Sequence, residues 1–221
     1  MKDRDLTFAV FGLGSFGGSL VKELAEMKQE ILAVDLNPER VDYYSQYATQ
    51  AVVASGYDEK TLRAFGVRNI DHAFVSFGED IQASVLTTMV LKELGVPKVW
   101  AKAHDENHGK ILEKIGADRV IHPERDMAKR ITHNLHSSKI IDFIELSNSF
   151  SIAEIKVTER SIGKKLSELD LQKRFNVNLV AIQRGQQTIL SFTEDEEVQR
   201  GDLIVVIGNN DDIENFDEGG S

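Results

Sequence analysis

The chain contains no cysteine among its 221 residues. This absence excludes disulfide bridges, thiolate catalysis and metal sites built from thiolates. The sequence also lacks an apolar run close to the roughly 18 residues that cross a bilayer, and no signal-like segment opens it. We therefore expect a cytoplasmic protein without direct membrane insertion, which reaches a membrane only through a partner.

An excess of positive charge is also missing. Lys and Arg together number 26 against 36 Asp and Glu, which gives a formal net charge of −10, and no basic tract stands out. Binding of nucleic acid or anionic lipid through bulk charge is disfavoured, so we expect no nucleic-acid partner. The remaining composition, 41% hydrophobic and 28% charged, is that of an ordinary globular chain with one or two domains.

The chain does have a short apolar run, residues 6–11, that breaks into glycines and continues with helical periodicity. Gly12, Gly14 and Gly17 follow the G-x-G-x-x-G spacing of a nucleotide-binding turn. The first glycine permits the tight turn, the second lets phosphate approach the backbone, and the third lets helix and strand pack closely. This pattern predicts a phosphate cradle at the start of the helix, whose N–H groups and dipole favour anions.

An acidic residue strengthens this interpretation. Asp35 ends the next apolar run, about twenty residues after the glycines, where a carboxylate accepts hydrogen bonds from a ribose hydroxyl. Glycine pairs alone are a weak signal because ordinary turns contain them. The combination predicts a mononucleotide or dinucleotide site.

Short apolar runs then alternate with helical stretches as far as Pro123, which predicts a parallel sheet with right-handed crossovers. With the glycine turn after the first strand, the expected fold is α/β: a doubly wound parallel (Rossmann) sheet in the order 3-2-1-4-5-6. The predicted strands are residues 6–11, 30–35, 50–54, 72–77, 99–103 and 119–122.

The remaining chain predicts a small α+β domain. We expect a nucleotide-binding domain over residues 1–136, a linking helix over 137–148, the second domain over 149–217 and a tail over 218–221. One helical stripe contains Met127 and Ile131, and a second contains Ile140, Ile141 and Ile144. Such apolar stripes pack on the sheet or on another subunit, which suggests contacts for dimerisation.

Other chemistry has weaker support. His104 with His108, and His133 with His136, share helical faces, but no third ligand at helical spacing accompanies either pair, so packing or solvated histidines are favoured over a metal site. Glu124 follows the sixth strand. Its position fits equally a carboxylate at the rim of the binding crevice and an acidic residue that begins the next helix.

Five segments carry a family resemblance: Gly12-Leu-Gly-Ser-Phe-Gly-Gly-Ser19, Gly78-Glu-Asp-Ile-Gln-Ala-Ser84, Leu112-Glu-Lys-Ile-Gly-Ala-Asp118, His122-Pro-Glu-Arg-Asp-Met127 and Gly201-Asp-Leu-Ile-Val-Val-Ile-Gly208. Together they resemble the cytosolic regulatory subunit of the Ktr potassium-uptake systems, and the resemblance covers essentially the whole chain. Members of this family carry an RCK (TrkA-N) Rossmann domain followed by a TrkA-C domain.

The resemblance implies a protein that is not an enzyme. It implies a homo-oligomer, an octameric ring built from dimers, that docks on an integral-membrane potassium-translocating subunit and gates it according to whether ATP or ADP is bound. By the same likeness NAD or NADH can occupy the site, Glu124 helps to bind a cation beside the phosphates, and the TrkA-C domain can bind cyclic di-AMP. Oxygen ligands at Glu124 suit Mg²⁺ or Ca²⁺.

Within this hypothesis each candidate residue has a place. Asp35 holds the ribose, and Ser55 and Tyr57, after the third strand, lie near the adenine. The expected phosphate turn consists of Gly12, Gly14, Ser15, Phe16, Gly17 and Gly18, and Gly78, Glu79 and Lys102 border the ribose and phosphates.

Two positions depart from the family pattern. Many relatives have an arginine in place of Ser15, which reaches the terminal phosphate across the dimer, so this chain lacks a charge-assisted contact of about 1.5 to 3 kcal/mol. Relatives also tend to have an arginine near Gln172, on the surface expected to bind cyclic di-AMP.

Two other classes of protein compete with this hypothesis. A nicotinamide-dependent oxidoreductase would use the same cradle, although the small second domain offers no evident acid or base for a substrate. A metabolite sensor for a different transporter or a sodium/proton exchanger would share the whole architecture.

Overall fold

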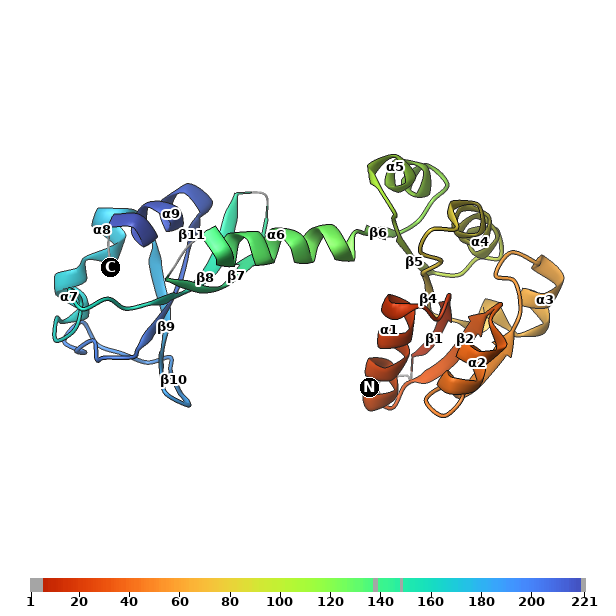
Figure 1. Cartoon of the computed structure of the whole chain (residues 1–221), viewed down its shortest axis with the longest axis horizontal. Coiled ribbons are helices and arrows are strands. Elements are labelled where there is room, and N and C mark those ends of the chain that lie inside the picture. Colours follow the sequence, from red (N-terminus) through yellow and green to blue (C-terminus); the bar gives the residue numbers. More distant parts are fainter. Residues whose placement is uncertain (1–5, 137–138, 148, 220–221) are drawn as a thin grey trace. The chain divides into compact units, whose positions relative to one another are not determined.

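The computed structural model describes residues 6–136, 139–147 and 149–219. By their contacts the residues divide into two compact units, Met1–Pro123 and Glu124–Ser221. Each unit has its own sheet (Figure 1). Each also has its own hydrophobic core.

The first unit contains a parallel six-stranded sheet in the order β3-β2-β1-β4-β5-β6, which confirms the predicted doubly wound fold (Figure 1). The central strand β1 pairs with β2 on one side and with β4 on the other, so its carboxyl end lies at the point where the strand order reverses. The strands are β1 (Thr7–Phe11), β2 (Glu30–Asp35), β3 (Gln50–Val53), β4 (His72–Val75), β5 (Lys98–Lys102) and β6 (Arg119–Ile121).

Both faces of this sheet are covered, because successive side chains along a strand point to opposite sides. In β1, Ala9 and Phe11 pack into a core cluster with Leu62, Leu91 and Leu112 of three helices, whereas the intervening Val10 belongs to a second cluster with residues of α1 and α2. The helical segments are α1 (Ser15–Glu26), α2 (Pro38–Tyr44), α3 (Glu59–Ala64), the short 3-10 helix η1 (Val67–Asn69), α4 (Ile81–Glu93) and α5 (Glu106–Lys114).

The second unit is the predicted small α+β domain. Its five-stranded antiparallel sheet has the order β10-β9-β11-β8-β7 (Figure 1). The elements of this part of the chain are α6 (Pro123–His136), β7 (Ile140–Glu145), β8 (Phe150–Lys156), α7 (Leu166–Leu169), α8 (Leu171–Phe175), β9 (Asn178–Arg184), β10 (Gln187–Ile189), β11 (Leu203–Asn209) and α9 (Asn210–Gly219).

The predicted linking helix over residues 137–148 is wrong. Residues 140–145 form β7, which pairs antiparallel with β8 and shifts register between Ile140 and Asp142. Ile140 is 8% exposed and packs in the core of the second unit, so it is not a free dimerisation contact. The β-branched isoleucines fit a pleated sheet, and the register shift breaks the strict alternation of the strand, so that the buried residues Ile140 and Phe143 lie three positions apart, as on a helical face. Residues 137, 138 and 148 lie outside the described ranges.

Two further differences concern local boundaries. The helices α7 and α8 are separate because the chain is interrupted at Asp170, whose φ of 43° belongs to the left-handed region. The helix α9 reaches into the predicted tail, of which residues 220 and 221 lie outside the description. The contacts also group α6 with the second unit, whereas the predicted boundary followed residue 136. Within the described ranges, every helix is too short or too polar to traverse a bilayer.

Candidate functional site

The glycine turn between β1 and α1 has the geometry that the sequence predicts. Gly12 adopts a φ of +89°, and a Cβ on it would lie 2.4 Å from the carbonyl oxygen of Ser76. A Cβ on Gly17 would lie 1.9 Å from the Gly12 carbonyl oxygen, so this residue allows the helix to approach the strand. A Cβ on Gly14 would meet no atom within 4 Å, so the backbone at this point faces open space. The turn therefore leaves room for a ligand at Gly14.

The helix α1 starts without a cap, unlike its neighbours. Side-chain oxygens accept hydrogen bonds from the first-turn amides of α2, α3, α4 and α5; these caps are Asn37, Asp58, Asp80 and Asp105. In α1 the N-cap is Gly14, which has no side chain to accept such a bond, and no acidic residue lies in the first turn. Its first N–H groups are therefore available to an anion, which the helix dipole attracts.

Asp35 connects β2 to this turn. Its Oδ2 accepts a hydrogen bond of 2.6 Å from the backbone N–H of Leu13, and its Oδ1 accepts one of 2.8 Å from the N–H of Asn37. The residue is 6% exposed. A carboxylate has about four acceptor sites, so the remaining two can accept hydrogen bonds from ribose hydroxyls. Asp35 thus both fixes the glycine turn and presents a charged acceptor.

A cavity of about 420 Å³ joins these features. Eight residues that the sequence assigns to the site line it: Gly12, Gly14, Ser15, Phe16, Asp35, Gly78, Glu79 and Lys102. The Nζ of Lys102 lies 6.0 Å from the centre of the Phe16 ring, so a cation and an aromatic ring stand together on the wall. The structure therefore brings the first, second, fourth and fifth strand ends to one cavity.

The other four candidates do not line this cavity. Gly17 has the packing role given above, and a Cβ on Gly18 would lie 1.9 Å from the hydroxyl of Tyr44, so Gly18 serves the packing of α1 on α2. Ser55 is partly exposed and Tyr57 is 43% exposed, both after β3. A role for Ser55 and Tyr57 at the adenine stays a prediction.

The sequence reasoning missed four lining residues: Leu36, Arg40, Ser76 and Phe77. Leu36, Ser76 and Phe77 directly follow strands whose ends were already assigned to the site, so they could have been inferred from their neighbours. Arg40 lies in the first turn of α2, and its Nη1 is 3.6 Å from Oδ2 of Asp35. Its only sequence signal is its closeness to Asp35 along the chain.

The candidate metal residue belongs to the other unit. Glu124 lies in the first turn of α6 with Asp126, where carboxylates are favourable for the helix dipole. Among the residues that the structure describes, no three His, Asp or Glu side chains are grouped as metal ligands. Glu124 as a cation ligand stays a prediction.

The first histidine pair has a structural role. The backbone N–H of His104 donates to Nδ1 of His108 at 3.1 Å, and His108 is 2% exposed. Burial lowers the pKa of His108. His133 and His136 lie in α6, but their side chains are outside the description.

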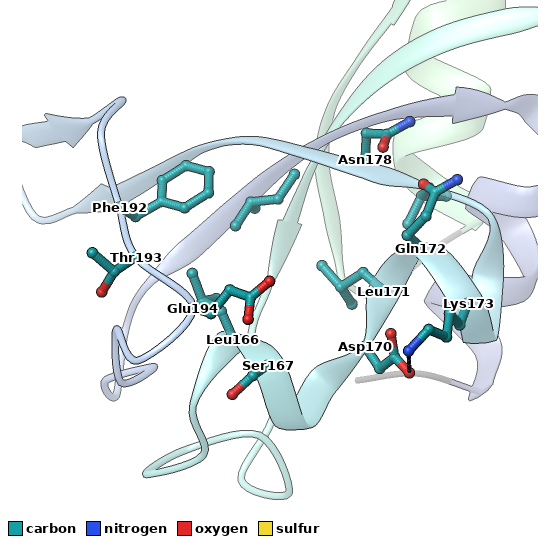
Figure 2. A pocket seen from close by; sticks show the side chains of 12 residues that line it. Leu166, Ser167, Asp170, Leu171, Gln172, Lys173, Asn178, Phe192, Thr193 and Glu194 are labelled. Carbon is teal, nitrogen blue, oxygen red and sulfur yellow. Dashed lines mark ion pairs between the residues drawn. The ribbon is translucent and has the colours of Figure 1, made fainter.

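The second unit has a cavity of its own, of about 500 Å³ (Figure 2). Its apolar wall consists of Leu166, Leu171, Val177, Leu179 and Phe192. Charged groups on its lining are Asp170, Lys173 and Glu194, and Lys173 lies 3.6 Å from Asp170 in an ion pair that Figure 2 marks with a dashed line. Gln172 also lines this cavity.

Comparison with known proteins agrees with both units. The TrkA-N domain model matches residues 8–123, and the TrkA-C domain model matches residues 152–218. The Ktr system potassium uptake protein C of Bacillus subtilis is 46% identical over 211 residues, 96% of each chain, and the Ktr system potassium uptake protein A of the same organism is 42% identical over 213 residues, again 96% of each.

Solved structures share the fold. The GsuK RCK domain covers 100% of this chain and 49% of its own with a TM-score of 0.69, and the GsuK channel bound to NAD covers 99% and 40% with a TM-score of 0.70, both at 15% identity. At this identity the likeness shows the fold alone. The two domain matches and the close relatives over nearly the full length decide the family: the chain belongs to the Ktr-type potassium-uptake regulatory proteins of the RCK family, with a TrkA-N domain followed by a TrkA-C domain.

Proposed function

We propose that this protein is the cytosolic nucleotide-sensing subunit of a potassium uptake system and that it binds ATP and ADP in the cavity at the glycine turn. The observation that supports the proposal best is the meeting of the uncapped N-terminus of α1 with the buried carboxylate of Asp35 in one cavity. The former suits phosphates and the latter suits a ribose. Relatives named as potassium uptake proteins support the gating role.

Calorimetric titration with ATP, ADP and NADH tests the nucleotide part of the proposal. We expect saturable binding of ATP and ADP by the full chain, and NADH competes for the same cavity because its adenosine and pyrophosphate match the same groups. An absence of ATP and ADP binding at millimolar ligand would refute the proposal.

The rival function, an NAD(H)-dependent oxidoreductase, shares the cavity, and one solved structure with the same fold is titled as bound to NAD. Glu79 and Lys102 are the cavity residues left to act as acid or base once Asp35 and the always-charged Arg40 are set aside. We propose that the protein is not an enzyme. Steady oxidation of NADH with small carbonyl compounds, followed by absorbance, would favour the rival.

We further propose that the chain assembles as dimers that form an octameric ring and dock on an integral-membrane potassium-translocating subunit. The exposed apolar side chains Met127, Ile131 and Ile144 support this, being 52%, 50% and 52% exposed. Light scattering should show dimers or larger species, and replacement of Met127 and Ile131 by Asp should shift them toward monomers. A wild-type monomer at micromolar concentration, with and without ATP, would contradict the ring. Co-purification with a tagged membrane subunit tests the docking.

A divalent cation at Glu124 is proposed as part of the nucleotide-bound state. Several phosphate charges join a protein of net charge −10, so a cation held by carboxylate oxygen would offset them. Mg²⁺ and Ca²⁺ both suit such a ligand.

Cyclic di-AMP binding by the second unit is a separate part of the proposal. Its phosphates would meet Asp170 and Glu194 at the cavity of the second unit, where Lys173 already pairs with Asp170. We expect weak binding, and Gln172→Arg should strengthen it by supplying a guanidinium for phosphate. Equal affinity of the wild type and this variant would remove Gln172 from the ligand surface.

A further inference from the structure

Arg40 stands between two adjoining cavities at the glycine turn. It lines the nucleotide cavity and also a second cavity of about 330 Å³. The second cavity is lined by Leu13, Gly14, Ser15, Glu39, Arg40, Tyr43 and Tyr44. Gly14, Ser15 and Arg40 are common to both, so the guanidinium and the uncapped start of α1 border the same space.

The backbone of Arg40 is fixed, whereas its side chain is held loosely. Its N–H donates to the Oδ1 of Asn37, which caps α2. Its Nη1 lies 3.6 Å from Oδ2 of Asp35, too long for a hydrogen bond, and the side chain is 53% exposed. Asp35 keeps its two backbone donors when the guanidinium turns away. Arg40 can therefore reorient toward a ligand at little cost in free energy.

The balance of charge in the cavity at the glycine turn favours a mobile cation such as the Arg40 guanidinium. The two carboxylates of Asp35 and Glu79 offset the positive charges of Arg40 and Lys102, and Ser15 at the first position of α1 contributes no charge. Each phosphate brings negative charge beside the buried carboxylate of Asp35. A guanidinium that already lies next to Asp35 can offset that charge and pair with the phosphate in a fork.

We propose that the guanidinium of Arg40 binds the phosphate nearest the ribose of the bound nucleotide and thereby makes the site select phosphorylated adenosine over adenosine. This inference rests on the proposed nucleotide binding. Arg40 is then a specificity-determining residue supplied by the same chain that supplies the glycine turn. Lys102, on the opposite side of the strand order reversal, serves the more distant phosphates.

The test compares adenosine, AMP, ADP and ATP as competitors of a fluorescent ATP analogue. Arg40→Ala should weaken the binding of AMP, ADP and ATP by a similar factor, about 10- to 100-fold, because each loses one charged hydrogen-bonding partner. The affinity for adenosine should change less than about twofold, because adenosine has no phosphate for Arg40 to bind. Arg40→Gln, which keeps length and hydrogen bonding without charge, should behave like the alanine variant, and Arg40→Lys should lose less.

Arg63→Ala provides the matched control. Arg63 lies on α3, is 42% exposed and pairs with Glu59, and it lines neither cavity. Its affinities should equal those of the wild type. Urea unfolding of every variant shows whether it folds. If Arg40→Ala does not fold, the affinities of Arg40→Gln and Arg40→Lys are compared with those of the wild type instead.

Three outcomes overturn the inference. If Arg40→Ala and Arg40→Gln bind AMP as the wild type does while the wild type binds ATP, Arg40 does not contact that phosphate and the nucleotide function stands. If Arg40→Ala weakens the binding of adenosine as much as that of AMP, Arg40 acts through Asp35 or the base. If the wild type binds none of the four compounds, the proposed function itself fails, and the inference with it.

Discussion

Replacement of Asp35 by alanine should change ligand affinity and protein stability together, and the two effects can be measured apart. In the folded chain the carboxylate accepts hydrogen bonds from the N–H groups of Leu13 and Asn37 and lines the cavity at the glycine turn. Leu13 is 1% exposed, so its N–H cannot turn to water once the carboxylate is removed. Asp35→Ala therefore removes both the acceptor that holds the glycine turn and the proposed contact with the ligand.

The two losses have separate magnitudes. A buried N–H left without an acceptor costs about 1 to 3 kcal/mol, which should appear as a lower free energy of unfolding without ligand. Hydrogen bonds from a ribose to a charged acceptor contribute about 1.5 to 3 kcal/mol, which corresponds to roughly 10- to 150-fold weaker ATP binding. Asp35→Asn keeps one carbonyl acceptor, so both losses should be smaller.

Urea unfolding of the ligand-free protein measures the first quantity, and calorimetric titration with ATP measures the second. Asp42→Ala, at an exposed carboxylate on α2, is the control and should leave both unchanged. If stability falls while ATP affinity is unchanged, Asp35 only stabilises the turn and does not contact the nucleotide. If both stay, the hydrogen bonds at 2.6 and 2.8 Å do not have the energetic roles assigned to them.

Three further changes have expected outcomes. Glu124→Gln should abolish most of the tightening of ATP binding by Mg²⁺ or Ca²⁺ in calorimetry and leave metal-free binding nearly unchanged. Burial lowers the pKa of His108, whereas the unfolded chain keeps the usual value of about 6.5, so the unfolded state binds the proton first as pH falls. The free energy of unfolding should therefore fall as pH drops below about 6.5, and His108→Gln should flatten this dependence in urea titrations. Arg184→Met removes the guanidinium that binds Asp202 at 3.0 and 2.9 Å, and since Asp202 is buried, the variant should lose roughly 3 kcal/mol of stability by the same method.

Each change has its own contradicting result. If Mg²⁺ or Ca²⁺ tightens ATP binding to the Glu124 variant as much as to the wild type, Glu124 does not bind the cation and serves only as an acidic residue at the start of α6. Replacement of His104 by Gln is the control for His108, and an equal effect on the pH dependence would contradict the burial argument. Arg200→Met breaks an exposed ion pair with Glu159 and should lower the free energy of unfolding by less than about 1 kcal/mol. An equally small loss for Arg184→Met would contradict a stabilising role for the buried pair with Asp202.

The Rossmann fold could be predicted because its signals are local. Fully buried parallel strands appear as continuous apolar runs, and the glycine turn marks which run is the central strand, so the order of all six strands followed. Residues 140–145 lacked such a marker. Isoleucines four positions apart suit a helix in isolation, and only pairing with β8, with its shift of register, makes them a strand.

The candidate site was predictable where its residues end strands. Asp35, Gly78, Glu79 and Lys102 lie at or just after the carboxyl ends of strands that a doubly wound sheet brings together. Arg40 belongs to a helix, so its side-chain direction depends on how α2 packs, which no spacing rule supplies. Its place beside Asp35 required the folded chain.

The glycines show why a sequence motif mixes two kinds of requirement. Gly12 needs its left-handed backbone, and Gly17 and Gly18 need their missing side chains because the Gly12 carbonyl and the Tyr44 hydroxyl occupy that space. These three follow from the fold alone, so their presence says little about a ligand. Gly14 differs, because its backbone is not left-handed and a side chain there would meet no atom of the protein. Since the fold accepts a larger residue at this position, the glycine is best accounted for by something that approaches the open start of α1 from outside.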